Sequence, residues 1–303
     1  MPSWLHELVN LALRWLHVVA AIFWLGQTAL FTWMETRLRV ERDDTAGSPA
    51  GAELWMVHGG GFYRVEKLPW QVPPRVLHWF KWESALTWGS GLLLFGWVYH
   101  GGHILVPPDS RLGAWTDLPL ALAALVVAWV AYDLLWRSPL VARPRLGAAV
   151  SVALVAALAW ALGRVFTSRA AFLLVGAALG TIMAANVWMR ILPAMRRAVA
   201  AVAAGGAVEG PLAAQVARAG ARSRHNTYLA IPVVLTMISH HFPTTTYGHR
   251  FAWALLAVYV VVGFAARALI DRHERQPAPA APTATPTARV DPSPSPPAGG
   301  GAG

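Results

Sequence analysis

The residues best suited to chemistry lie in one segment between two apolar stretches, VHGGGFYRVEKLPWQVPPRVLHWFKWE, residues 57–83. This segment holds two histidines, three consecutive glycines, three tryptophans and six charged residues. Imidazoles exchange protons near neutral pH, and glycines let backbone N–H groups approach a bound anion closely. The same residues also have a structural interpretation, in which the glycines close a hairpin and the basic side chains contact lipid headgroups. The residue types alone leave both interpretations open.

Other histidines lie within or beside long apolar stretches, where an ionisable group is costly and is a functional hypothesis by default. Two imidazoles on separate helices at similar depth can hold a haem b. His17 with His240 or His241 is the pair that we expect, although His17 could instead carry a proton. The chain has no cysteine, which excludes disulfides, thiolate metal sites and a covalently attached haem c. No separate metal site is predicted.

The composition indicates what must position these side chains. Of the 303 residues, 56% are apolar and only 13% are charged, whereas soluble domains carry about 25% charged residues. Several uncharged apolar stretches of about 20 residues indicate a polytopic membrane protein. The fold class that we predict is therefore an all-α, polytopic membrane helical bundle of about seven transmembrane helices. The candidate spans are residues 11–34, 82–99, 118–137, 146–163, 170–190, 226–241 and 250–270.

The distribution of lysine and arginine predicts the orientation of these spans. Basic residues are concentrated in the segment 35–81, in the third-to-fourth and fifth-to-sixth connections, and after the seventh span. Under the positive-inside rule this pattern places the amino terminus outside and the carboxyl terminus in the cytoplasm. The net charge of +10 is thus interpreted as a signal of membrane topology, and no nucleic-acid partner is expected.

Two domains are predicted. Residues 1–275 form the transmembrane domain, which includes a structured cytoplasmic loop at 35–81. Residues 276–303 are a tail rich in proline and alanine that has too few large apolar residues to form a core, and we expect it to be disordered.

Several polar and small residues on the spans have two interpretations each. Glu83, Asp133 and Arg190 are either functional or a structural ion pair and its neighbour. Asn186 either contacts a ligand or bridges helices. Gly176, Gly180 and Ala184 recur every four residues, a spacing that predicts close helix packing.

Five sequence blocks, in order along the chain, carry a resemblance to a known family. They are RWLHVVAAIFWLG, ELWMVHGGGFYRVEK, LHWFKWESALTWGSG, GTIMAANVWMRILP and SRHNTYLAIPVVLTMISHHFP, within roughly residues 8–270. Together they resemble the membrane domain of the PuuD-type urate hydroxylases, the urate oxidase N-terminal family.

The resemblance implies an enzyme of purine catabolism in the bacterial inner membrane. It would oxidise urate to 5-hydroxyisourate and pass the electrons to a cytochrome c. Typical members carry a further span and then a cytochrome c domain with a C-x-x-C-H motif, and this sequence has neither after the seventh span. We therefore expect the cytochrome c to be a separate polypeptide. The alternative function is a non-catalytic haem b subunit for membrane electron transfer or anchoring.

The resemblance also suggests roles for the residues introduced first. His58 and His78 are predicted as the base and its orienting partner, with Glu83 and His225 as further catalytic residues. The predicted substrate-binding residues supply close backbone approach, positive charge, an aromatic face and an amide: Gly59, Gly60, Gly61, Phe62, Arg64, Lys81, Trp82 and Asn186.

Overall fold

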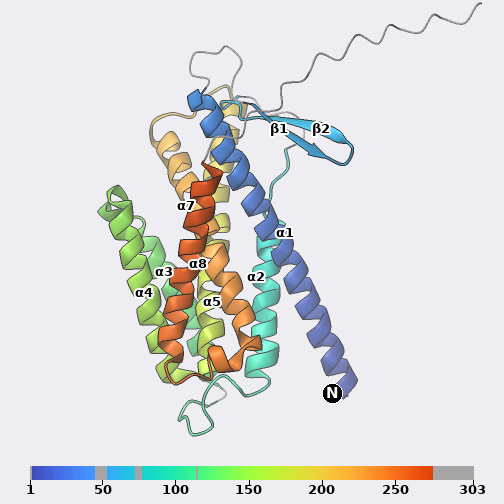
Figure 1. The fold of residues 1–303 in the computed structure, drawn as a ribbon, viewed down its shortest axis with the longest axis vertical. Coiled ribbons are helices and arrows are strands. Elements are labelled where there is room, and N and C mark those ends of the chain that lie inside the picture. Colours follow the sequence, from blue (N-terminus) through green and yellow to red (C-terminus); the bar gives the residue numbers. More distant parts are fainter. Residues whose placement is uncertain (1, 45–52, 72–76, 114, 276–303) are drawn as a thin grey trace, which may run out of the picture.

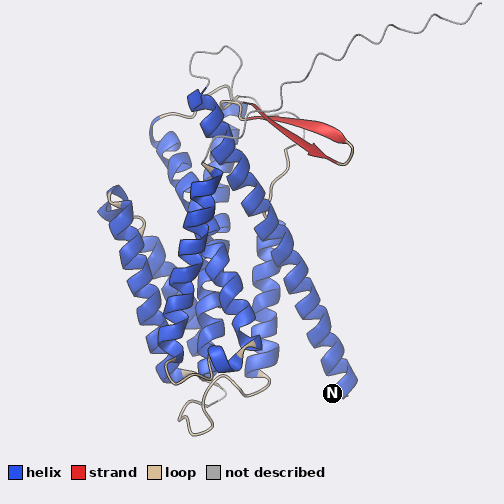
Figure 2. Ribbon diagram, in the orientation of Figure 1, coloured by secondary structure: helices blue, strands red, loops and turns tan. Residues whose placement is uncertain are grey.

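The computed structural model of the chain describes residues 2–44, 53–71, 77–113 and 115–275. Within these residues the chain forms a bundle of long, roughly parallel or antiparallel helices, with a single β-hairpin projecting from one end (Figures 1 and 2). The predicted all-α class is confirmed apart from that hairpin. The predicted tail at 276–303 lies outside the described residues.

Helices account for almost all of the described elements. The α-helices are α1 (Ser3–Asp44), α2 (Trp82–Leu94), α3 (Asp117–Leu135), α4 (Pro144–Val165), α5 (Ser168–Ala185), α6 (Leu192–Ala203), α7 (Gly210–Ile238) and α8 (Ala252–Glu274). Two π-helical segments extend α2 and join α5 to α6, namely η1 (Phe95–His100) and η3 (Asn186–Ile191). Short 3₁₀ turns are η2 (Pro139–Ala142), η4 (Ser239–His241) and η5 (Pro243–Thr245).

Local sequence signals explain where several helices begin. Pro144 opens α4, where its missing N–H has no partner to lose. Thr167 precedes α5, and its hydroxyl accepts a hydrogen bond from the Ala170 N–H at 3.3 Å. The same hydroxyl donates to the Ile104 carbonyl at 2.9 Å, which ties the connection before α3 to the turn before α5.

Five helical segments among the described residues are long and apolar enough to cross a membrane. They are Ser3–Arg39, Asp117–Leu135, Pro144–Val165, Ser168–Ala203 and Ala252–Glu274. The other two predicted spans are also helical, but 82–99 is divided between the 13-residue α2 and η1. Span 226–241 is divided between the second half of α7, whose first half is polar, and the short turn η4. The count of seven and the orientation of the chain stay predictions.

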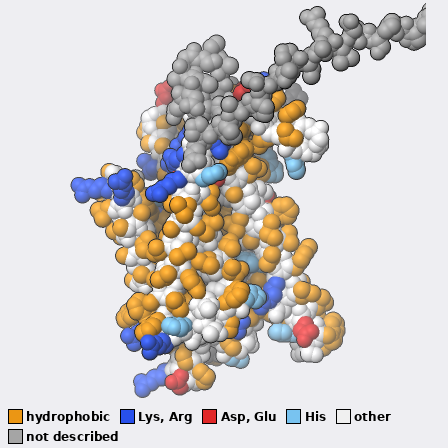
Figure 3. All heavy atoms as spheres, in the orientation of Figure 1, with side chains coloured by type: hydrophobic (Ala, Val, Ile, Leu, Met, Phe, Trp, Pro, Cys, Tyr) orange, Lys and Arg blue, Asp and Glu red, His pale blue; other side chains and the backbone are white. Residues whose placement is uncertain are grey.

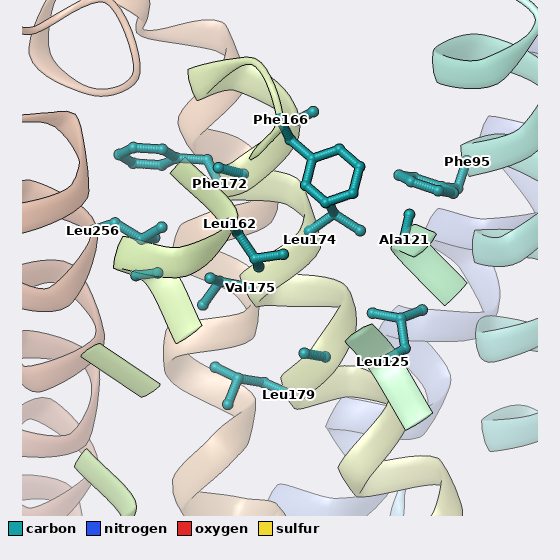
Figure 4. Packing of buried hydrophobic residues seen from close by; sticks show 14 of the residues in the cluster. Phe95, Ala121, Leu125, Leu162, Phe166, Phe172, Leu174, Val175, Leu179 and Leu256 are labelled. Atoms are coloured by element: carbon teal, nitrogen blue, oxygen red, sulfur yellow. The ribbon is translucent and has the colours of Figure 1, made fainter. Parts of the chain in front are cut away.

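Helix α5 lies at the centre of the bundle and packs against α3, α4, α7 and α8. Its buried Phe172, Leu174, Val175 and Leu179 contribute to one apolar cluster with side chains of α3, α4, α8 and η1 (Figure 4). Close packing of such side chains holds neighbouring helices in fixed positions.

Two glycines set the closest approaches to α7. A Cβ at Gly176 of α5 would lie 2.4 Å from the Thr236 Oγ1, so the predicted close packing holds there. At Gly180, the next small residue, a Cβ would meet nothing within 4 Å. On α8, a Cβ at Gly263 would lie 2.8 Å from the backbone of Pro232, inside α7.

The hairpin occupies the middle of the predicted cytoplasmic loop. Strand β1 (Glu53–His58) pairs antiparallel with β2 (Gly61–Glu66), with Val57 opposite Phe62 and His58 opposite Gly61. Gly59 and Gly60 form the turn with φ angles of +60° and +84°, which glycine adopts without strain. The glycines therefore close a hairpin, while contact of the basic side chains with lipid headgroups stays a prediction.

Candidate functional site

A cluster of three guanidiniums around one carboxylate lies near the carboxyl end of α3. Asp133 is almost fully buried and accepts hydrogen bonds from Nε and Nη2 of Arg190, the first at 2.9 Å. It also accepts one from Nη2 of the buried Arg222 at 3.0 Å, and Arg137 Nη1 lies 3.5 Å away. The interpretation of Asp133 and Arg190 as an ion pair is confirmed. Because three guanidiniums surround a single carboxylate, the cluster carries a surplus of positive charge.

Tyr132, next to Asp133, connects this cluster to a second set of polar side chains. The Arg222 guanidinium lies over the Tyr132 ring, 4.7 Å from its centre. The Tyr132 hydroxyl is 2.8 Å from Nδ1 of His225 and accepts a hydrogen bond from Nδ2 of Asn186 at 3.1 Å. Asn186 also donates to Oδ1 of Asn226 at 2.9 Å. The site therefore combines side chains of α3, η3 and α7.

Two buried polar atoms in this site have no hydrogen-bond partner among the described residues. They are Oδ1 of Asn186 and Nη1 of Arg222. Both hydrogens of the Asn186 amide already go to Tyr132 and Asn226, so the remaining Asn186 atom is an acceptor without a donor. An unsatisfied buried polar group costs about 1–3 kcal/mol. An acceptor and a cationic donor, both on side chains that touch Tyr132, are therefore suited to a polar anionic ligand.

The charge state of His225 follows from its surroundings. His225 precedes the predicted span 226–241, and its ring stacks at a tilt on Trp136, with centroids 4.1 Å apart. Burial, together with the nearby Arg222 and Arg224 guanidiniums, lowers the pKa of His225 to about 4. The imidazole is therefore neutral at physiological pH and can accept a proton.

The hairpin residues of the predicted site lie apart from this network. His58, the three glycines at 59–61, Phe62 and Arg64 are all exposed on the hairpin, which extends away from the helices (Figure 1). Arg64 pairs with Glu66 of the same strand at 2.5 Å and with Glu53 of the facing strand at 3.5 Å. The structure thus does not bring these residues to His225 and Asn186, and their roles stay predictions.

The remaining predicted residues from this loop lie at the start of α2. His78 is exposed and contacts the Phe80 ring, with centroids 4.5 Å apart. Lys81 lies 5.0 Å from the Trp82 ring centre, and Trp82 contacts Trp188 of η3 edge-on. Glu83 accepts a hydrogen bond from Gln27 at 3.4 Å. These side chains form aromatic and polar contacts at the junction of α1, α2 and η3.

The three histidines predicted as haem ligands occupy two places. His17 lies against α2, where its Nδ1 is 2.9 Å from the Thr87 carbonyl and its ring fits over Gly91. His240 lies beyond α7, with Nδ1 2.5 Å from the Met237 carbonyl and its ring beside that of His241. Anchoring of Nδ1 by a backbone carbonyl is common in histidines that bind metal through Nε2. Among the described residues, no three His, Asp or Glu side chains lie close enough to form a metal site of their own.

The family comparison agrees with the helical, membrane-type architecture. The urate oxidase N-terminal family matches residues 3–290, nearly the whole chain. The chain belongs to the urate oxidase N-terminal family. No curated protein and no solved structure matches it. Family membership indicates a urate-related function, for which the polar network is the best-formed candidate site.

The sequence predicts His225 and Asn186 as site residues, but three other members of the polar network were not predicted from it. Tyr132, Arg222 and Asn226 complete the network. Arg222 belongs to the fifth-to-sixth connection, whose basic residues are interpreted as a signal of topology, because the next span is predicted to begin at 226. A signal was present, because Arg222, His225 and Asn226 are three and four residues apart and so share one face of a helix.

Proposed function

We propose that this protein oxidises urate to 5-hydroxyisourate in the bacterial cytoplasmic membrane and that the electrons pass to a cytochrome c. In this reaction urate and one water give 5-hydroxyisourate, two protons and two electrons. Each of two ferric cytochrome c molecules takes up one electron. Family membership supports a urate-related role, and the buried polar network supports the presence of a site for a planar anion.

The observation that carries the proposal is the pair of buried unpartnered atoms beside Tyr132. Urate offers N–H donors, which Oδ1 of Asn186 can accept, and negatively charged oxygen, which Nη1 of Arg222 can bind. Three guanidiniums against the single Asp133 carboxylate supply the charge that an anion needs. Such charge-assisted hydrogen bonds in a site shielded from water are worth more than the same bonds in solvent.

The Tyr132–His225 pair provides a route for a proton. The tyrosine oxygen accepts a proton from the substrate N–H or from the attacking water while its own proton moves to Nδ1 of His225, 2.8 Å away. The imidazole begins neutral, because its pKa lies near 4. The negative charge of bound urate raises that pKa and so makes His225 a better base when substrate is present.

The electrons must then leave the site. The hydrocarbon core of a bilayer is about 30 Å thick, so transfer from a site near one face to an acceptor at the other requires a relay. The residues that would hold a haem b are His17 and either His240 or His241, which are consecutive in the sequence. The Nδ1 of His17 is anchored by a carbonyl and its ring lies over Gly91. A bound haem b would supply one-electron redox chemistry. The sequence has no cysteine and so attaches no haem c itself.

The decisive experiment compares two arginine variants of the purified protein. Reduction of added cytochrome c is followed after addition of urate, and 5-hydroxyisourate is identified by mass spectrometry. Arg222→Gln removes the buried cation, and we expect kcat/KM for urate to fall by about 10–100-fold, as expected for a charged hydrogen bond of about 1.5–3 kcal/mol. Arg218→Gln, one turn earlier on α7 and exposed, makes the same charge change and should leave kcat/KM unaltered.

Equal activity in the two variants would contradict the assignment of the site to this network. The same assay then tests the predicted loop residues, because His58→Ala and His78→Ala change only exposed side chains. A large loss of activity in these variants would move the site to the hairpin and the start of α2. A protein that never reduces cytochrome c with urate would overturn the proposed reaction.

The anchoring of His17 also favours a second candidate function, a non-catalytic haem b subunit for electron transfer. The imidazole has its Nδ1 at a carbonyl, and within the described residues no hydrogen bond is seen at its Nε2, the arrangement expected of an axial ligand. This function predicts a visible haem spectrum that His17→Ala abolishes and no reduction of that haem by urate. Urate-dependent reduction would favour the enzyme.

A further inference from the structure

A second site lies at the opposite end of the bundle from Asp133. A cavity of about 350 Å³ opens between the carboxyl end of α4 and the amino ends of α5 and α8. Helix α3 runs from Asp117 to Leu135 and α4 returns antiparallel to it, so this cavity and the polar network are separated by most of the length of a helix. The proposed urate reaction makes no use of the cavity.

One end of the cavity is strongly basic. Arg164, His249 and Arg250 line it, and the described residues of its lining include no aspartate or glutamate. Among the described residues neither arginine forms an ion pair with a carboxylate: Arg164 lies 5.2 Å from the Trp160 ring centre and Arg250 lies 4.5 Å from that of Phe251. Basic and histidine side chains gather at this lower end of α4 and α8 in Figure 3. The two guanidiniums are therefore available to an anion.

Two helix starts add to this positive character. Ser168 opens α5 and Ala252 opens α8, and both residues line the cavity. The free N–H groups and the dipole at a helix amino end favour a negative charge. Alone, these helix ends would not define a ligand, but they lie beside both arginines.

The other end of the cavity is apolar. Ala159 and Leu256 lie about one turn deeper along α4 and α8 than Arg164 and Ala252, and Ala171 of α5 also lines the cavity. The half-exposed Trp160 and Trp253 form the sides. Tryptophan is typical of the level at which lipid headgroups meet the hydrocarbon. The cavity thus has a basic end at the helix termini and an apolar floor that continues along the helices.

We propose that this cavity binds an anionic phospholipid, with its phosphate between Arg164 and Arg250 and an acyl chain on the floor between α4 and α8. Arginine binds phosphate oxygens through paired N–H donors, and basic pockets between membrane helices bind lipid headgroups. A free phosphate would use the basic end but leave the apolar floor uncovered. A purine anion likewise has no part that matches the floor.

The chain offers variants that test the two ends separately. Arg164→Gln with Arg250→Gln removes the positive charge. The control is Arg143→Gln with Arg145→Gln, which makes the same charge change on exposed residues at the other end of α4. Gly163→Leu keeps both arginines and fills the cavity, because a Cβ at Gly163 would meet only the Trp253 Cβ, at an ordinary contact distance of 4.0 Å.

Native mass spectrometry of the full chain, titrated with phosphatidylglycerol or phosphatidylcholine, measures the bound fraction. We expect one phosphatidylglycerol to bind tightly and phosphatidylcholine to bind more weakly. The affinity for phosphatidylglycerol should fall about tenfold or more in the double arginine variant, since each arginine near a lipid phosphate contributes about 1 kcal/mol. Gly163→Leu should also lose the lipid, whereas the control pair should keep it.

Four results would overturn the proposal. Phosphatidylglycerol and phosphatidylcholine could bind equally, or binding could be unchanged in both the double arginine variant and Gly163→Leu. Inorganic phosphate could displace phosphatidylglycerol at equal concentration, which would show that the acyl floor contributes nothing and that the site takes a soluble anion. Displacement by urate at equal concentration would likewise reject a lipid occupant.

Discussion

Individual side chains in the polar network act through their neighbours. Tyr132 contacts Asn186 and His225 through its hydroxyl and Arg222 through its ring, so it links the side chain with the unpartnered acceptor, the neutral imidazole and the guanidinium with the unpartnered donor. Arg222 is buried and holds Asp133 with one terminal nitrogen, while the other has no hydrogen-bond partner in the described part of the chain. An arginine that served only to neutralise Asp133 would have no reason to leave a buried donor free, since Arg190 already binds that carboxylate through two nitrogens.

The pKa of His225 leads to a prediction at the scale of this residue. Histidine NMR signals of the substrate-free protein should include one that stays in its neutral form from pH 8 down to about 5, because the pKa of His225 is about 4. Protonation would place a third positive charge beside Arg222 and Arg224, so the shift must be downward. His225→Gln should remove this signal and thereby assign it.

Adding urate near neutral pH should move the titration of the same signal upward, because an anion next to the ring favours the imidazolium. A His225 signal that titrates near the ordinary value of about 6.5 would contradict the buried, arginine-flanked setting.

Helices were the most predictable elements, since their signal is spread over many apolar residues. The spacing of Gly176, Gly180 and Ala184 predicted close packing of α5, which holds at Gly176, where Thr236 fills the space, but not at Gly180. Spacing places residues on a face without specifying which neighbour each one meets. For the same reason Asn186 and His225 stand out by residue type alone. Arg222 has only the weaker signal of its spacing from His225 and Asn226, and it falls outside a span predicted to begin at 226, whereas α7 begins at Gly210.

The contact between α7 and α8 gives a prediction at the scale of elements. Gly263→Ala places a methyl carbon only 2.8 Å from the backbone of Pro232, which is closer than van der Waals contact allows. Helix α8 must therefore shift away from α7. Overpacking of this kind costs about 1–3 kcal/mol of stability. We expect a lower thermal unfolding midpoint in detergent.

Gly180→Ala is the matched control for this change. Its Cβ meets nothing within 4 Å, and alanine favours a helix over glycine by about 1 kcal/mol, so its midpoint should stay or rise. A Gly263→Ala protein as stable as this control would show that the two helices are not held in contact at Pro232.

The whole molecule has two chemically different ends. The hairpin, the start of α2 and the Asp133 cluster lie at one end, and the connection before α3, the cavity between α4 and α8 and the turn after α7 lie at the other (Figure 1). The distribution of lysine and arginine predicts that the hairpin end faces the cytoplasm. In that orientation the polar network lies at the end of the bundle that urate made inside the cell would reach first. The histidines His240 and His241 then lie toward the side from which a cytochrome c outside the membrane would collect electrons.

Orientation is directly testable, because the chain contains no cysteine and any introduced thiol is unique. Tyr63→Cys places an exposed thiol on the hairpin, and Asp109→Cys places one in the connection between η1 and α3. A membrane-impermeant maleimide applied to intact spheroplasts should label Asp109→Cys and leave Tyr63→Cys unlabelled until the membrane is opened. In inverted vesicles the pattern should reverse. Labelling of Tyr63→Cys in sealed spheroplasts would put the hairpin and the polar network outside, and urate would then reach the network without first entering the cell.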